Sequence, residues 1–473
     1  MLTFFNKEAE QLVYVVNSRK PLHEKDIEKF KWLFAGCDSI STDGIKGTFV
    51  GPRREMITPW STNAVEITLN MGLEGIERIE AFRPDNGKMD PMLEMVYKGL
   101  TADMFDQNRE PEPVRLIDHI EEYNEEKGLA LSFEEVRFLK YISKKIGRKL
   151  TDSEIFGFSQ INSEHCRHKI FNGQYIIDGI EHEMTLFQWI KLTTKEHPNE
   201  VISAYKDNVA FIDGPEIELF CPEQDDVPSD FTIRKAESVI SLKAETHNFP
   251  TTVEPFFGAS TGSGGEIRDR MAGGKGCMPL VGTAVYMTSK LQLEEPVADE
   301  NGTVPERRKF LYQTPEEILI KASNGASDFG NKFGQPLITG SLLTFEHQEG
   351  ETLTAYDKVI MLAGGVGYGV KSQAIKGKPG PGNLIVLMGG DNYRIGMGGG
   401  AVSSVETGKY NNAIELNAVQ RANPEMQKRV YNVVRALSES PENPIISIHD
   451  HGAGGHLNCF SELVEDTGGT IFL

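Results

Sequence analysis

The chain has 473 residues, a length that corresponds to roughly three domains of ordinary size. Its 49 Lys and Arg residues against 69 Asp and Glu residues give a net charge of -20, which disfavours nucleic acid and anionic membranes as partners. The sequence has no stretch of about 18 consecutive apolar residues, so it predicts no membrane span. The five cysteines are scattered without a C-x-x-C pair, which predicts a reduced, cytoplasmic protein without a disulfide framework.

Glycine is the one unusual count. Of the 47 glycines, 14 precede residue 258 and 33 follow from there on, so the second half is about twice as rich in glycine as a typical protein. Because glycine lacks a Cβ atom, this excess predicts that the backbone of the second half makes close contacts that a side chain would block.

Residues 1–106 alternate strand-like and helical patterns and predict a small α+β module. The sequence predicts strands at 12–18, 47–57 and 75–83, and helices at 25–34 and 92–100. Two prolines and mixed charge within 107–116 indicate a boundary.

Residues 107–170 predict a helical linker region. A helical pattern covers 133–147 and places Phe133, Val136, either Leu139 or Lys140, and either Ser143 or Ile146 near one face. Thr151-Asp152 is typical of the N-cap of a further helix through Phe156.

From residue 171 the pattern changes to strands and glycine-rich loops. Strands are predicted at 209–214, 238–246, 281–289 and 358–370, and the turn-rich segment 376–383 indicates a joint before a further region.

The segment GASTGSGGEIRD, residues 258–269, is the most informative one. We interpret its four glycines as a phosphate-cradling loop and EIRD as the opening of a helix, with a tight loop that binds nothing as an equal alternative. It matches neither the Walker pattern nor the dinucleotide fingerprint. Arg268 suits phosphate or carboxylate, and Asp269 suits Mg²⁺.

Three further motifs carry clustered polar residues. ETHN, residues 245–248, follows an apolar strand, where the alternative is a turn with a structural histidine. In SEHCRHK, residues 163–169, adjacent His165 and Cys166 point in different directions, so their being neighbours does not make them a nucleophile and base pair. A cysteine-protease site and a charged, exposed helix end are the alternatives for this motif. In SIHDHGAGGHLN, residues 447–458, an apolar strand precedes Asp450; a zinc site of the three histidines is the alternative to Mg²⁺ and phosphate.

Together, SEHCRHKIFNG, ETHNFPTTVEPFFGASTGSGGEIRD, NGASDFGNKFGQP, YRIGMGGGAVSS and SIHDHGAGG closely resemble the large, single-chain type of phosphoribosylformylglycinamidine synthase. The resemblance implies a ligase of purine biosynthesis that uses ATP to convert formylglycinamide ribonucleotide and ammonia to the amidine. The ammonia comes from glutamine in a separate glutaminase domain, so the family is a glutamine amidotransferase family.

The resemblance also implies a fold. After the α+β module (1–106) and the helical linker (107–170), we expect an α/β ATP-binding domain like that of aminoimidazole ribonucleotide synthetase at 171–379, followed by an α+β domain at 380–473.

The resemblance assigns site residues. His247 and His165 match catalytic histidines. Residues that match Mg²⁺ ligands are Glu245, Asp269 and Asp450. Residues that match the ribonucleotide site are Thr246, Asn248, Arg268 and Gln420. Residues that match the ATP contacts are Gly258, Ala259, Thr261, Gly262, Ser263, Gly264, Gly265 and Asp269.

Two departures from the family qualify these expectations. Phe249 stands where many relatives have a second histidine, and this removes position 249 from acid-base chemistry. The chain ends in what the pattern suggests is an unfinished strand, so we expect an N-terminal fragment without the second synthase half and the glutaminase. Cys166 is therefore not the glutaminase nucleophile.

From such a fragment we expect little or no turnover and possible self-association through the exposed half-interface. Two alternatives remain: a scaffold half that binds nucleotide without catalysis, and another ATP-using enzyme of the same fold.

Overall fold

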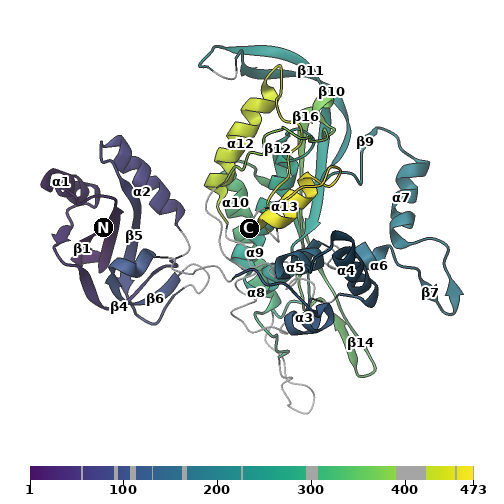
Figure 1. Cartoon of the computed structure of the whole chain (residues 1–473), viewed down its shortest axis with the longest axis horizontal. Coiled ribbons are helices and arrows are strands. Elements are labelled where there is room, and N and C mark those ends of the chain that lie inside the picture. Colours follow the sequence, from purple (N-terminus) through teal and green to yellow (C-terminus); the bar gives the residue numbers. More distant parts are fainter. Residues whose placement is uncertain are drawn as a thin grey trace. The chain divides into compact units, whose positions relative to one another are not determined.

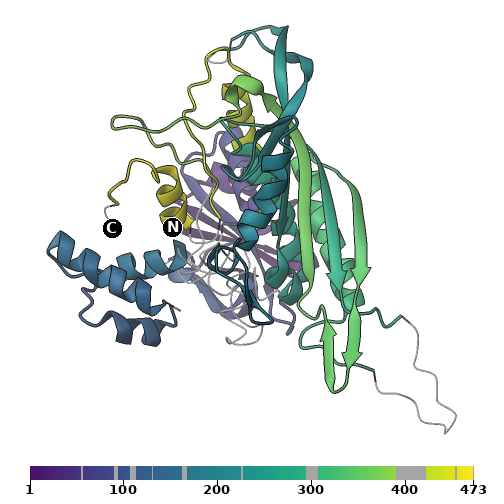
Figure 2. The ribbon, with the colours of Figure 1, turned by 90° about the vertical axis from the view of Figure 1, so that its right-hand side faces the viewer.

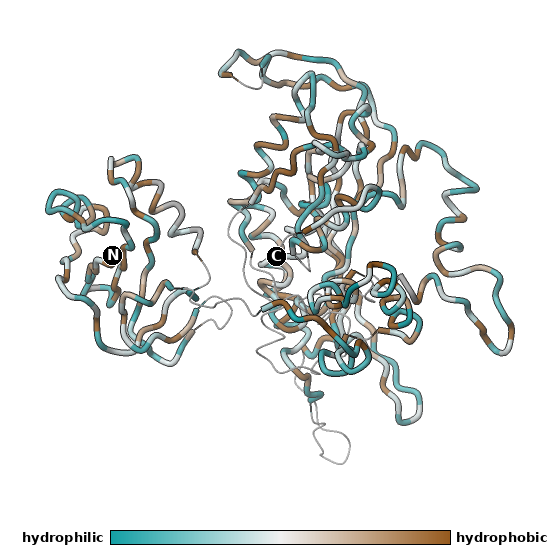
Figure 3. Tube along the Cα trace, in the orientation of Figure 1, coloured by the Kyte–Doolittle hydropathy of each residue, from teal (hydrophilic) through white to brown (hydrophobic). Residues whose placement is uncertain are grey.

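The structure is a computed structural model, and it describes residues 1–54, 57–89, 94–106, 113–129, 131–161, 168–224, 227–293, 307–389, 422–452 and 455–471. The chain divides into two compact units, one that extends to Pro113 and one that begins at Val114. Both alternate hydrophobic and hydrophilic segments along the chain (Figure 3).

The first unit is a six-stranded antiparallel sheet in the order β3-β1-β2-β5-β4-β6 (Figure 1). Its strands are β1 (Leu2–Lys7), β2 (Leu12–Ser18), β3 (Asp38–Ile40), β4 (Gly44–Pro52), β5 (Ile76–Pro84) and β6 (Glu94–Thr101). Its helices are α1 (Glu24–Leu33), α2 (Pro59–Asn70) and the short 3-10 turns η1 (Glu8–Glu10) and η2 (Ala102–Phe105).

Each face of this sheet has its own core. Phe4 and Phe5 are neighbours in β1 and are both fully buried, because successive side chains of a strand point to opposite faces. Phe5 packs with Phe30 of α1, whereas Phe4 belongs to the cluster that contains Met104 of η2. The α+β module is thereby confirmed.

One predicted helix of this module is wrong. Residues 92–100 were expected to be helical, but Glu94–Thr101 forms β6, which pairs with β4 and buries Tyr97 and Leu100. Tertiary pairing with the sheet overrides the helical spacing of the apolar residues. The helix α2, which the sequence pattern did not reveal, is capped at its start by Thr58, whose hydroxyl accepts a hydrogen bond from the Ser61 amide at 3.0 Å.

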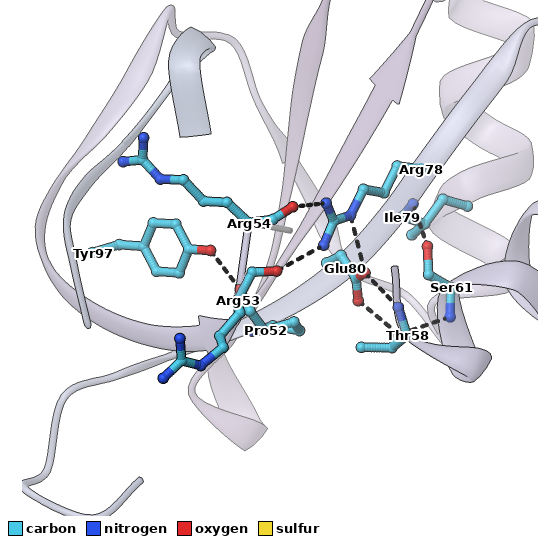
Figure 4. Close-up of polar contacts among 9 residues, drawn as sticks. All are labelled: Pro52, Arg53, Arg54, Thr58, Ser61, Arg78, Ile79, Glu80 and Tyr97. Atoms are coloured by element: carbon cyan, nitrogen blue, oxygen red, sulfur yellow. Dashed lines mark hydrogen bonds and ion pairs between the residues drawn. The ribbon is translucent and has the colours of Figure 1, made fainter. Parts of the chain in front are cut away.

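A buried ion pair within β5 is hydrogen-bonded to the residue that precedes α2 (Figure 4). Arg78 Nε donates to Glu80 Oε1 at 3.1 Å, and both side chains are almost completely buried. Glu80 also accepts bonds from the amide and the hydroxyl of Thr58. Burial raises the pKa of Glu80, although Arg78 and Thr58 favour its charged form.

Arg78 also holds the loop that follows β4. Its Nη1 and Nη2 atoms donate to the carbonyls of Arg54 and Arg53 at 2.8 and 3.3 Å. The guanidinium therefore satisfies a carboxylate and two backbone carbonyls in one buried network (Figure 4).

In the second unit, the predicted helical linker consists of α3 (Ile120–Lys127), α4 (Phe133–Ile146) and α5 (Asp152–Ile161). Ser132 and Glu135 form a capping box at the start of α4, and Thr151 accepts a bond from the Glu154 amide at the start of α5. On the expected apolar face of α4, Val136 and Leu139 are buried, but Phe133 and Ile146 are exposed.

The core of the second unit is a six-stranded sheet in the order β13-β12-β16-β11-β10-β9. All neighbouring strands are antiparallel except β12 and β13, which are parallel. The strands are β9 (Val201–Ser203), β10 (Ala210–Pro222), β11 (Phe231–Thr246), β12 (Met278–Thr288), β13 (Leu337–Thr344) and β16 (Ile360–Val370). The long strands lie side by side in Figure 2.

Helices cover one face of this sheet. The helix α9 (Pro255–Met271) lies against β11, β16 and β12, and α10 (Pro315–Phe333) packs on α9 and connects the parallel strands β12 and β13. The other helices among the described residues of this unit are α6 (His168–Phe171), α7 (Leu186–Glu196), α8 (Asn248–Val253), η4 (Lys371–Gln373), α12 (Pro424–Glu439) and α13 (Gly455–Leu463).

Two hairpins lie outside the six-stranded sheet; one follows its edge strand β13, and the other lies between α6 and α7 in the sequence (Figures 1 and 2). One contains β14 (Glu346–Glu349) and β15 (Thr352–Ala355), and the other contains β7 (Ile176–Ile177) and β8 (Ile180–Glu181). None of the helices in the described ranges is both long enough and apolar enough to cross a membrane.

The strand expected just before Asp450 is wrong. Residues 444–448 form no strand, and the described part of 468–471 is not a strand either. An apolar run becomes a strand only when a neighbouring strand pairs with it, and the described residues around these runs supply none.

We expect Arg78→Met to lower the free energy of unfolding of the first unit by about 3–5 kcal/mol, because it leaves Glu80 buried without its cation. Urea unfolding followed by the fluorescence of Trp32 and Trp60, in a Trp189→Phe background, measures this change. Adding Glu80→Gln should recover part of the loss.

The matched control is Arg19→Met, since Arg19 pairs with Glu77 at 2.9 Å on the surface of the same unit. This change should cost less than about 1 kcal/mol. Equal effects of the two arginine substitutions would contradict a special role for the buried pair.

Candidate active site

The ETHN segment lies where β11 ends and α8 begins, and it is tied to β16. The His247 amide donates to the Met361 carbonyl at 2.8 Å, and Asn248 Oδ1 accepts from the Met361 amide at 3.2 Å. Thr252 Oγ1 accepts from the amide of Val359. These bonds fix the turn in which the strand becomes a helix.

Alternation along β11 separates the polar residues. Lys243 and Glu245 share the face that α9 covers, whereas Thr246 lies on the opposite face and is exposed. Phe249 is buried, with the Lys358 ammonium 5.6 Å from its ring centroid.

The predicted phosphate-cradling loop is wrong as a loop. Residues 258–269 all lie within α9, and EIRD forms the end of this helix rather than its beginning. The Gly258 amide already donates to the Glu254 carbonyl at 2.7 Å, and amides inside a helix bond to carbonyls four residues earlier. A phosphate group therefore finds no free row of amides along this segment.

The glycines of α9 instead permit close packing of protein against protein. A Cβ atom at Gly258 would lie 2.3 Å from the Pro250 carbonyl carbon, and one at Gly264 would lie 2.7 Å from the Phe329 ring. At Gly265 the nearest atom is Glu245 Oε1, at 3.4 Å. The glycines bring the helix close to α8, α10 and the end of β11.

This packing places the last turn of α9 beside the end of β11. Lys243 Nζ lies 2.6 Å from Asp269 Oδ2 and 3.0 Å from Glu245 Oε2. Arg268 Nε lies 3.5 Å from Asp450 Oδ2. Three carboxylates and two cations, predicted from separate motifs except for Lys243, thus form one cluster.

Burial and like charges decide where the proton of this cluster resides. Burial, with the nearby carboxylates of Asp450 and Glu245, raises the pKa of Asp269 to about 9. Burial opposes ionisation of Glu245 as well, but Lys243 and a hydrogen bond from Asp269 hold the pKa of Glu245 below its usual value. These shifts favour the protonated form of Asp269 and the ionised form of Glu245.

Asn208 is a site residue that the sequence reasoning missed. Its Nδ2 atom donates to Asp269 Oδ1 at 3.3 Å and to Asp450 Oδ1 at 3.2 Å. The preceding Asp207 bonds to Lys376 Nζ at 2.7 Å and to the Gly274 amide at 2.8 Å, which anchors the turn. No motif at 207–208 identified this role, because it depends on segments far apart in the sequence.

The donor chemistry of the cluster fits Mg²⁺, since carboxylate oxygens are its preferred protein ligands. The geometry is not that of a formed metal site: within the described ranges no three His, Cys, Asp or Glu side chains converge in a way that could hold a metal ion. The Lys243 ammonium lies between Glu245 and Asp269 and neutralises them instead.

The remaining predicted site residues are placed as follows. His165, Cys166 and Gln420 lie outside the described residues, as does the whole glycine-rich motif YRIGMGGGAVSS at 393–404. Of the three histidines near Asp450, His451 and His456 are in contact through ring nitrogens 2.8 Å apart, while His449 Nδ1 faces Glu462 Oε2 at 3.6 Å.

Three family models match successive parts of the chain. The model of the N-terminal domain of formylglycinamide ribonucleotide amidotransferase matches residues 11–106, and that of its linker domain matches residues 120–169. The C-terminal domain model of proteins related to AIR synthase matches residues 380–473. The chain belongs to the phosphoribosylformylglycinamidine synthase family. The predicted α+β module, helical linker and synthetase-like region are confirmed with it.

Solved structures from Thermotoga maritima are similar over part of their length. "T. maritima PurL complexed with FGAR" is 23% identical with a TM-score of 0.42, over 70% of this chain and 41% of that one. "T. maritima PurL complexed with ATP" is 21% identical with a TM-score of 0.38, over 70% and 40%. The chain thus spans about two fifths of the length of these proteins.

We expect Gly264→Ala to destabilise the protein by about 1–3 kcal/mol, because the added methyl group overlaps the Phe329 ring. An exposed helical glycine would instead gain up to about 1 kcal/mol on the same change. Thermal unfolding without nucleotide measures the effect. Gly380→Ala, where the nearest atom would be 3.7 Å away, is the control; equal results would contradict the packing role.

We expect the stability of the Asp269→Asn variant, relative to that of the wild type, to increase as the pH rises. The folded-state pKa of Asp269, about 9, exceeds its ordinary value of 3.8, so the wild type loses stability as the pH rises between these two values. The loss is at most about 1.4 kcal/mol per pH unit, and asparagine does not titrate.

Melting temperatures of both proteins at pH 6 and pH 8.5 measure this trend. Asp213→Asn is the control, since the pKa of Asp213 is lowered and its carboxylate stays ionised across the window. A difference between Asp269→Asn and the wild type that does not change with pH would contradict the raised pKa.

Proposed function

We propose that this chain forms the first synthase half of an enzyme that converts formylglycinamide ribonucleotide and ammonia to formylglycinamidine ribonucleotide with ATP. This is a C-N ligase reaction of purine biosynthesis. The observation that carries the proposal is the convergence of Glu245, Asp269 and Asp450 with Lys243 and Arg268, in a chain of this family.

The proposed chemistry makes modest demands on the protein. ATP phosphorylates the formamide oxygen, and ammonia then displaces phosphate. Phosphoryl transfer depends on positioning and on neutralisation of charge. The cations of Lys243 and Arg268 are suited to phosphate and carboxylate groups, and they lie where β11 and α9 both end.

The resemblance assigns the remaining roles. We propose His247 and His165 as catalytic histidines, and Thr246, Asn248, Arg268 and Gln420 as contacts of the ribonucleotide. For ATP we do not retain the backbone cradle at 258–265, because these amides belong to a buried helix. Asp269, at the exit of that helix, stays in the proposal.

We include Mg²⁺ in the proposal because the cluster supplies carboxylate oxygens as ligands. Glu245, Asp269 and Asp450 would hold it, and it would neutralise charge on the phosphates of ATP. In the structure, the Lys243 ammonium pairs with two of these carboxyl groups, those of Glu245 and Asp269.

One face of the six-stranded sheet is our candidate contact surface for another chain or domain. Its edge strand β13 pairs with β12, and Leu343 of β13 and Leu242 of β11 are exposed on the face away from α9. We propose that this face meets the second synthase half or, in its absence, a second copy of the chain. We further propose a cytoplasmic location, ammonia supplied by a glutaminase outside these residues, and little turnover by this chain alone.

The competing proposal is a scaffold half that binds nucleotide without turning it over. Both proposals predict nucleotide binding, so the discriminating test is catalytic.

We expect His247→Ala to lower ammonia-dependent synthesis about 10²–10⁴-fold, in a polypeptide that joins these residues to a second synthase half, because His247 acts in proton transfer. Binding of ATP and the melting temperature should change little. His197→Ala, on the exposed end of α7, is the control. Full activity of His247→Ala would favour the scaffold instead.

A further inference from the structure

Two histidines beside the candidate active site face each other through their ring nitrogens. His451 Nε2 lies 2.8 Å from His456 Nδ1, and the ring planes are 88° apart. His451 follows Asp450 directly, and His456 is the second residue of α13. The family chemistry proposed above uses neither ring.

One aromatic side chain orients both imidazoles. Phe460 lies one turn after His456 on α13, and the two rings stack with centroids 5.7 Å apart and planes 11° apart. His451 meets the same Phe460 ring edge-on, at 82° and 6.2 Å. The two nitrogens thus face each other across a packed arrangement of three rings.

We propose that His451 and His456 bind Zn²⁺, or a similar divalent transition metal, through these two nitrogens. Imidazole suits zinc, copper and nickel, whereas Mg²⁺ prefers oxygen ligands. The site is therefore chemically distinct from the neighbouring cluster of carboxylates.

Metal binding requires a small rearrangement of the two imidazoles, in which the pair loses no proton overall. In the neutral pair, one of the two facing nitrogens carries a hydrogen and the other accepts it. When the metal binds, that hydrogen moves to the other nitrogen of the same ring, so His451 keeps a proton on Nδ1 and His456 keeps one on Nε2. The facing nitrogens must separate to roughly 3.4 Å for a tetrahedral zinc ion.

The exposed position of His456 permits this movement, and water completes the coordination. His449 is not part of the pair, because its Nδ1 atom faces Glu462. The net charge of -20 favours the approach of cations to the protein.

The test is calorimetric titration of the whole chain, without a polyhistidine tag, with Zn²⁺ in the presence of excess Mg²⁺. We expect binding by the wild type, at least tenfold weaker binding by His451→Gln and by His456→Gln, and no binding at this site by the double variant. His347→Gln, on the exposed hairpin strand β14, should bind like the wild type.

A second measurement separates metal binding from a change in fold. Cu²⁺ bound to the wild type should show electron paramagnetic resonance couplings from two imidazole nitrogens, and each single variant should lose one of them. Failure of the wild type to bind Zn²⁺, or unchanged Zn²⁺ affinity and Cu²⁺ couplings in a double variant that melts like the wild type, would overturn the proposal.

Discussion

The close approach of α9 to its neighbours is the constraint on which the candidate site depends. Glycine at positions 258, 264 and 265 leaves no side chain between the helix and α8, α10 or the end of β11. Only at this separation can Lys243 Nζ reach Asp269 and Glu245 together. In this segment, the glycines of the sequence thus allow close packing of protein against protein. This packing positions the charged side chains at the end of the helix.

Buried charge is balanced in the same way in both units. In the first unit, Arg78 and Glu80 neutralise each other inside a network that ties a strand to a helix. In the second, the cations of Lys243 and Arg268 pair with three acidic side chains, and burial raises the pKa of one of them, Asp269. The difference is that the second cluster lies at the ends of its elements, where a ligand can replace one of the partners, whereas the first lies inside the module.

Local patterns predicted much of this structure, and long-range pairing accounts for the errors. The helix at 133–146 has its own capping box, and the strand that ends at Thr246 has a short apolar run, so both could be predicted from the sequence. Residues 92–100 became a strand through pairing with β4, and residues 258–269 became a buried helix despite four glycines. Glu245, Asp269 and Asp450 were predicted from motifs that resemble the family. Asn208, which joins Asp269 and Asp450, could not be, because only folding brings it there.

The central claim is that the cluster at the ends of β11 and α9 binds the phosphates of the reaction. A crystal structure of the chain with formylglycinamide ribonucleotide and a non-hydrolysable ATP analogue tests it most directly. The account predicts phosphate oxygens within hydrogen-bonding distance of Lys243 or Arg268, with rearranged contacts to Asp269 or Asp450. Both ligands bound elsewhere, with these ion pairs unchanged, would contradict it.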